Sequence, residues 1–269
     1  MTTLAIRGRL ILAAAVAVLF AIITAGLPTN ELARADQSSD YKGKWCFAWI
    51  PEKQKEKPAE RGALLRGAKW NSGDTISVSF LDGDRGVQDK VSAFAKHWTR
   101  AGGGPANLTF NFQNDTNSDI RISFKYTGSW SVIGTTCRQI TNKEQPTMNF
   151  GWLTSDTPDS EVKRVVLHEF GHAIGLAHEH QNPAGGIEWD QVQVIKDLSG
   201  PPNNWSIPVI SRNMFETYSN EETNHTGTTD GSSIMMYPIP KTWTKNGFSA
   251  GLNTALSDTD KSFVREQYP

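Results

Sequence analysis

The chain has 269 residues, and its 27 Lys and Arg against 28 Asp and Glu give a formal net charge of −1. Hydrophobic residues make up 38% and charged residues 20%, a composition that excludes disordered, collagen-like and coiled-coil proteins. The near-neutral charge gives no electrostatic basis for binding nucleic acid or an acidic membrane surface. Two cysteines are too few for a disulfide-framework miniprotein or a cysteine-rich metal cluster.

The N-terminal segment has the pattern of a secretory signal peptide. Its first nine residues carry two arginines and no acid, residues 10–26 are uncharged and almost wholly apolar, and residues 33–35 place small residues where signal peptidase cuts. We expect residues 1–35 to be removed, with a competing cleavage site near Ala25. The alternative, a retained membrane anchor, is disfavoured because the apolar run is shorter than the roughly 20 residues that a span needs.

Removal of residues 1–35 leaves 234 residues with a formal net charge of −3. No second apolar run approaches membrane-spanning length, so we expect a secreted monomer, extracellular or periplasmic, without membrane attachment. In that oxidising compartment Cys46 and Cys137 either pair or stay free, because the sequence does not give their separation. Residues 36–66 are interpreted as an N-terminal arm packed on the protein or as a short propeptide, and residues 67–269 as one domain.

Short segments of alternating polarity between residues 75 and 153 indicate the strands of a mixed sheet. The expected strands are 75–81, 108–112, 120–126, 128–134 and 147–153, and the expected helix among them is 87–101. A second helix is expected to start with Thr157 as a hydroxyl N-cap and Pro158 in the first helical position, and to end near Gly175. Later residues show few periodic segments apart from a short helix at 192–198 and a closing helix at 258–268.

The second helix carries a metal-binding motif, H-E-x-x-H-x-x-G-x-x-H. His168 and His172 are four residues apart and therefore share one helix face, where two imidazoles can hold one Zn²⁺. Gly175 allows the left-handed turn that brings His178 to a third corner. Three histidines leave a fourth position open for water, which is typical of a catalytic zinc site, and Glu169 can reach that water as a general base.

The motif resembles that of the metzincin zinc endopeptidases. Metzincins also have a methionine turn beneath the zinc, and the segment SIMMYP at 233–238 is similar to it. Met235 fits the turn methionine, with Met236 as the alternative if the register differs by one. Tyr237 fits the tyrosine that astacin-like members place near the metal, where it hydrogen-bonds the oxyanion; the alternative is a tyrosine packed under the helix.

Three further stretches resemble the astacin-like branch. They are Glu179 directly after the third histidine, the segment GSWSVIG at 128–134, and LSDTD at 256–260 before the closing helix. In that branch the glutamate is linked to the mature N-terminus; otherwise Glu179 is a solvated charge. Leu176 and the Met-Tyr-Pro segment are matrixin-like, which leaves the matrixins as second choice. His180 lies just outside the ligand set and is expected at the surface or behind the ligands.

The resemblance implies an α+β zincin-like domain. Its elements would be a twisted mixed five-stranded sheet, a backing helix, an active-site helix and a mostly irregular C-terminal subdomain with a closing helix. It implies a secreted endopeptidase that hydrolyses proteins or peptides through one zinc-activated water, with Glu169 and Tyr237 catalytic. A substrate peptide is expected to add to the sheet edge near residues 129–134. The alternative is a secreted binding protein on an inactive metzincin scaffold, which the intact Glu169 disfavours.

Overall fold

The computed structural model of the protein describes residues 44, 46–49, 64–221 and 223–269. The expected signal peptide, residues 1–35, and most of the arm, residues 36–66, lie outside these ranges. Within the described ranges, no helix combines the length and the apolar character that a membrane crossing requires.

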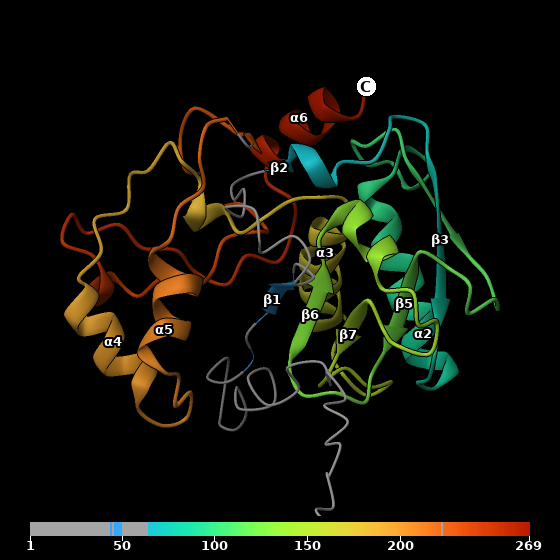
Figure 1. The fold of residues 1–269 in the computed structure, drawn as a ribbon, viewed down its shortest axis with the longest axis horizontal. Helices are drawn as coiled ribbons and strands as arrows, with labels where there is room; N and C mark the ends of the chain where they lie inside the picture. The colour runs from blue at the N-terminus through green and yellow to red at the C-terminus, as the bar shows by residue number, and fades with distance from the viewer. Residues whose placement is uncertain (1–43, 45, 50–63, 222) are drawn as a thin grey trace, which may run out of the picture.

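The main sheet has six strands in the order β1-β6-β7-β5-β3-β4. They are β1 (Cys46–Trp49), β3 (Thr75–Phe80), β4 (Thr109–Phe112), β5 (Ile120–Ser123), β6 (Ser129–Val132) and β7 (Met148–Phe150). All neighbours are parallel except β6 and β7, so the sheet is mixed as expected. The strands β3 to β7 are the five expected from the sequence. The sixth, β1, comes from the arm and lies alongside β6 (Figure 1).

The helices pack against this sheet or form the C-terminal subdomain, residues 184–269 (Figure 1). They are α2 (Arg85–Ala95), α3 (Asp159–Ala173), α4 (Gln191–Ser199), α5 (Ile207–Ile210) and α6 (Asp258–Gln267). The expected N-cap of α3 is wrong, because the Thr157 hydroxyl accepts from the Thr154 amide and Pro158 takes the cap position without a side-chain bond. A small sheet pairs β2 (Leu64–Leu65) with β8 (Thr223–Asn224).

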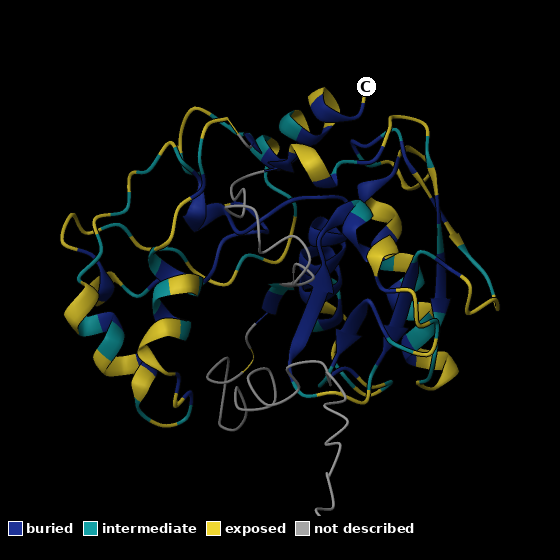
Figure 2. Cartoon of the chain, in the orientation of Figure 1, coloured by how far each residue is buried: buried dark blue, intermediate teal, exposed yellow. Residues whose placement is uncertain are grey.

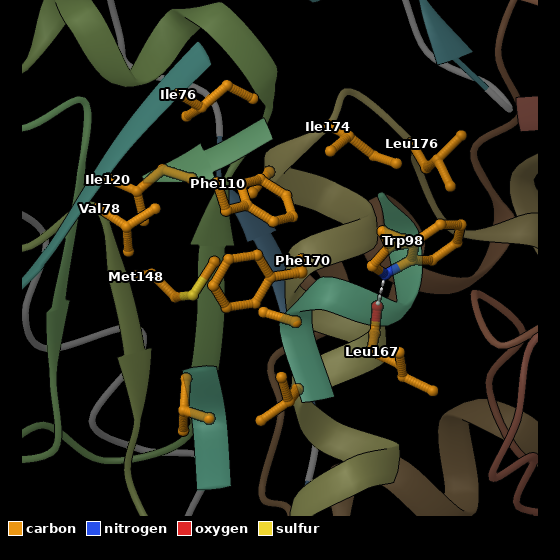
Figure 3. Close-up of a cluster of buried hydrophobic side chains, with 14 of the residues drawn as sticks. Ile76, Val78, Trp98, Phe110, Ile120, Met148, Leu167, Phe170, Ile174 and Leu176 are labelled. Carbon is orange, nitrogen blue, oxygen red and sulfur yellow. Dashed lines mark hydrogen bonds between the residues drawn. The ribbon is translucent and has the colours of Figure 1, made fainter. Parts of the chain in front are cut away.

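Helix α3 is the most buried of the described α-helices, and most of its ribbon is dark blue in Figure 2. Phe170 meets Phe110 of β4 edge-on at 4.9 Å between ring centroids. The Trp98 indole donates to the Leu167 carbonyl at 2.8 Å, which joins the end of the α2 segment to α3 (Figure 3). Fully buried side chains of this size each stabilise the fold by about 2–3 kcal/mol. This packing holds α3 rigidly against the sheet.

The C-terminal subdomain has a second buried cluster of its own. This cluster includes Val194, Leu198, Trp205, Ile210, Met214, Met236, Tyr237, Ile239 and Trp243. Most of the chain between these residues is loop, as expected, and α6 closes the fold. Ser257 caps α6 in a capping box with Asp260. The Tyr268 hydroxyl at the end of α6 donates to the Ile174 carbonyl and so ties the closing helix to the segment after α3.

Candidate metal centre

Three buried histidines meet where α3 ends. His168 and His172 lie one turn apart on α3, and the chain then turns at Gly175, whose φ of 102° is in the left-handed region. This turn returns His178 to the same place. One ring nitrogen from each histidine lies within 4.8 Å of the others. The structure therefore brings together all three of the predicted zinc ligands.

The tautomers of these histidines suit a metal. Nδ1 of His168 donates to the Ile234 carbonyl at 2.8 Å, and Nδ1 of His172 donates to the Leu176 carbonyl at 2.7 Å. A carbonyl can only accept, so these bonds fix the proton on Nδ1 and leave Nε2 as an unprotonated ligand atom. Nε2 of His168 is buried without a hydrogen-bond partner, and Nε2 of His172 lies 3.2 Å from Nε2 of His178. Two such lone pairs, together with the ring of His178 at the same buried point, fit a zinc ion.

Burial keeps these imidazoles neutral. It lowers the pKa of His172 to about 4. Burial, together with the positive charge that a neighbouring imidazolium would add, lowers the pKa of His168 and of His178 well below the ordinary value. Neutral imidazole is the form that ligates zinc, so the site is ready for the metal at neutral pH.

Glu169 adds a carboxylate to this cavity. It is fully buried, and neither of its oxygens has a hydrogen-bond partner among the described residues. Burial raises its pKa well above the ordinary value, while the Cys46 thiol and the Arg164 guanidinium oppose the rise. Burial and then the negative charge of Glu169 also raise the pKa of that thiol. A buried carboxyl with a raised pKa can accept a proton and give it back.

The ring of Tyr237 lies beside the rings of two of the histidines. Its ring centroid lies 4.2 Å from that of His178 and 6.3 Å from that of His168. Its hydroxyl donates to the backbone carbonyl of Cys46. Burial raises the pKa of Tyr237 well above its usual value, so the hydroxyl stays protonated and can donate. The structure thus places this side chain beside the ligands, with its hydroxyl on a peptide carbonyl.

The methionine turn lies directly beneath α3. A Cβ at Gly171 would collide with Sδ of Met235, so the glycine between the first two histidines makes room for this methionine. Met236 instead belongs to the C-terminal cluster. Asp260 of α6 accepts from the Ile234 amide at 2.9 Å and so holds the turn in place. The sequence left the register open, and the structure puts Met235 under the histidines.

The arm reaches the site, which the sequence did not indicate. Along its whole length β1 pairs in parallel with β6, the edge at which a substrate peptide was expected. Cys46 lines a pocket together with Arg164, His168 and Tyr237. Cys46 and Cys137 are both buried and free, so the disulfide considered from the sequence is absent. Neither Cys46 nor Arg164 belongs to the zinc motif, and only the fold brings them to it.

Two charged or polar neighbours of the ligands are also buried. His180 is 3% exposed, donates from Nε2 to the Asn213 carbonyl at 2.7 Å, and stacks on Tyr237 at 4.7 Å between centroids. It lies behind the ligands, and the surface alternative was wrong. Glu179 is 8% exposed and accepts from the Asp230 amide, and burial raises its pKa to about 7. It is therefore not a solvated charge.

Comparison with known proteins places the chain in a family. No protein-family model matches the chain, and no curated protein sequence does either. One solved structure of myroilysin is 42% identical, with a TM-score of 0.73, over 77% of this chain and 98% of that one. A second, a crystal structure of myroilysin, is 36% identical, with a TM-score of 0.62, over 91% and 97%. High choriolytic enzyme 1, a hatching-enzyme zinc protease of the medaka Oryzias latipes, matches at 16% identity and a TM-score of 0.49, over 78% and 98%.

The two myroilysin matches cover nearly the whole of each matched chain at well over 30% identity. They agree with the sequence motif and with the three histidines that converge in the structure. The chain belongs to the astacin-like metzincins and is a zinc metalloendopeptidase with one catalytic zinc.

Proposed function

We propose that this protein is a secreted endopeptidase in which His168, His172 and His178 hold the zinc and Glu169 is the general base. One observation carries the proposal. Three imidazole nitrogens converge beside a fully buried carboxyl group whose oxygens have no hydrogen-bond partner among the described residues. Burying a carboxyl group without a hydrogen-bond partner costs folding free energy. Such groups are common at sites where the carboxyl accepts and donates a proton during catalysis.

The residues have separate tasks. Zinc at this site supplies a Lewis acid for water and for the peptide carbonyl. Glu169 takes the proton of the attacking water and delivers it to the leaving amine. Tyr237 donates a hydrogen bond to the carbonyl oxygen of the scissile peptide as negative charge develops there. Its present bond to the Cys46 carbonyl supports this task, because that carbonyl belongs to a peptide lying against β6.

The same strand indicates how a substrate would bind. An exposed strand edge offers backbone donors and acceptors that any extended peptide can use, whatever its sequence. In the structure β1 uses those of β6. A substrate peptide would take this place, which brings its carbonyl to Tyr237 and its scissile bond to the histidines.

This argument also favours one of the two interpretations of the arm. We propose that residues 36–66 are a propeptide, because β1 fills the edge that a substrate needs and sets Cys46 beside Glu169. The enzyme would then be inactive until the arm is removed. The supporting contacts are those of the four described residues of β1.

The test compares Glu169→Ala with wild type, both produced as the full chain and processed to remove the arm. Casein hydrolysis should fall by a factor of about 10²–10⁴, the usual contribution of a general base. Zinc content, measured by elemental analysis, should stay at one ion. Asp159→Ala, at the exposed start of the same helix, is the matched control and should keep wild-type activity.

Two outcomes would contradict the proposal. A Glu169→Ala enzyme that cleaves casein at the wild-type rate would remove this residue as the base. A processed, zinc-loaded wild type that cleaves no protein or peptide would favour the alternative of a binding protein on an inactive metzincin scaffold.

A further inference from the structure

Phe47 of the arm buries its ring in the C-terminal cluster. The residue is 7% exposed and belongs to the same buried cluster as Trp130 and Trp205. Its ring centroid lies 5.6 Å from that of Trp205, at an interplanar angle of 48°. Trp130 is its partner in the register between β1 and β6. One aromatic side chain of the arm therefore lies between the sheet edge and the C-terminal subdomain.

Two neighbouring residues of the arm, Cys46 and Phe47, point to opposite sides of β1. Cys46 is near Glu169, whereas the next residue, Phe47, packs in the C-terminal cluster, since successive side chains of a strand point to opposite sides. Cys46 therefore faces Glu169, and Phe47 faces the C-terminal cluster. A peptide that replaced the arm along β6 would present its own alternate side chains in the same way.

Both walls of this pocket also have contacts outside the arm. Trp130 is part of β6, which the antiparallel neighbour β7 fixes from its other side. The Trp205 backbone amide donates to the Leu198 carbonyl at 2.9 Å and so ties the backbone of Trp205 to the end of α4. Leu198 itself is fully buried. These contacts would hold both walls in place after the arm departs.

We propose that the place occupied by Phe47, between Trp130 and Trp205, is a specificity pocket that selects substrates with an aromatic side chain. This proposal rests on the proposed peptidase function. Two indole rings would bind a flat aromatic ring favourably, because it buries a large apolar area and can adopt a preferred ring–ring arrangement. A charged side chain would instead lose its hydration there. Backbone pairing with β6 does not distinguish substrates, so this pocket supplies the selection.

The first experiment maps cleavage sites in a peptide mixture by mass spectrometry, with enzyme processed from the full chain. Wild type should favour Phe, Tyr or Trp at one position near the cleaved bond. Peptides that differ only by Phe or Ala at that position should then differ about 10- to 100-fold in kcat/KM. Trp205→Ala should reduce this ratio at least fivefold, and Trp205→Phe should keep most of it. Phe248→Ala, an aromatic side chain packed against the same cluster, is the control and should leave the ratio unchanged.

The second measurement needs no turnover, and its first two variants change only the arm. In the full chain, Phe47→Ala should speed amide hydrogen exchange in β1 and β6, because the arm loses its aromatic anchor. Phe47→Trp should restore slow exchange. Trp205→Ala should speed exchange in the same two strands.

The outcomes separate the two proposals. An active enzyme without aromatic preference, or with a preference that Trp205→Ala leaves intact, overturns the pocket and leaves the peptidase function standing. Unchanged exchange in Phe47→Ala overturns the pocket as well. A processed wild type that cleaves none of the peptides overturns the peptidase function, and the specificity pocket is then rejected too, because it rests on that function.

Discussion

The two halves of the molecule build the site by different means. The sheet and α3 contribute the histidines and Glu169 from one apolar core, in which Trp98 and Phe170 are fully buried. The C-terminal subdomain contributes the methionine turn and Tyr237 mostly from loops. Buried carboxyls hold these loops: Asp260 within the subdomain, and Glu179 just before it. Apolar packing does not change with pH, whereas a buried carboxyl does. The contribution of the apolar packing around α3 to stability should therefore stay constant over a pH range in which the contribution of these carboxyls changes.

The largest effect is expected in the apolar half. Trp98→Ala removes a fully buried indole and its bond to the Leu167 carbonyl, and it should lower the free energy of unfolding by about 3–5 kcal/mol. Urea unfolding at pH 5 and at pH 8 should give the same loss. A loss that changes strongly between the two pH values would contradict the division between the halves. Trp98→Phe should cost less, since the ring volume is partly kept.

Glu179 tests the polar half. Its ordinary pKa is 4.5, and burial raises it to about 7 in the folded protein. Between these values the folded state binds the proton more tightly than the unfolded chain, so stability should fall as pH rises from 4.5 to 7. Above pH 7 the buried charge costs about 3 kcal/mol. Glu179→Gln removes this titration and should be more stable than wild type at pH 8, with little difference at pH 4.5.

Unfolding curves of the full chain across pH 4 to 8 measure this effect. Glu161→Gln is a matched control, because the pKa of Glu161 is lowered. Burial would raise it, but hydrogen bonds from Arg164 and Trp152 prevail. Its removal should destabilise the protein above pH 4.5 instead. Parallel profiles for wild type and Glu179→Gln would show that this carboxyl is not held in the buried state.

The smallest effect concerns the side chain that joins the halves. Tyr237→Phe removes one hydroxyl and leaves the ring in its stack between His178 and His180. Turnover by the processed enzyme should fall about 10- to 100-fold with little change in KM, because the lost hydrogen bond forms in the transition state. Steady-state kinetics on a peptide substrate measures both constants. An unchanged kcat would take Tyr237 out of catalysis and leave it a packing residue.

Much of the site could be predicted from the sequence because its signals are local. The spacing of His168, His172 and His178 around one helix end, and the glycine that ends it, fix the geometry within eleven residues. Five strands and four helices of the catalytic domain were recognisable because their polarity repeats with the period of each element. The start of α3 was misjudged because a local turn took the Thr157 hydroxyl.

What the sequence could not give involves contacts between distant segments. The pairing of β1 with β6 joins residues about eighty positions apart, and no local period encodes a parallel partner across that distance. The same holds for Cys46 beside Glu169 and for Phe47 between Trp130 and Trp205. Nor does a sequence tell a solvated glutamate from a buried one, as with Glu179. By itself, then, the sequence determined the metal motif through residue spacing, and it indicated the fold class through the resemblance to the metzincins. Only the tertiary structure decided what fills the sheet edge, because burial and strand pairing are properties of the whole packed chain.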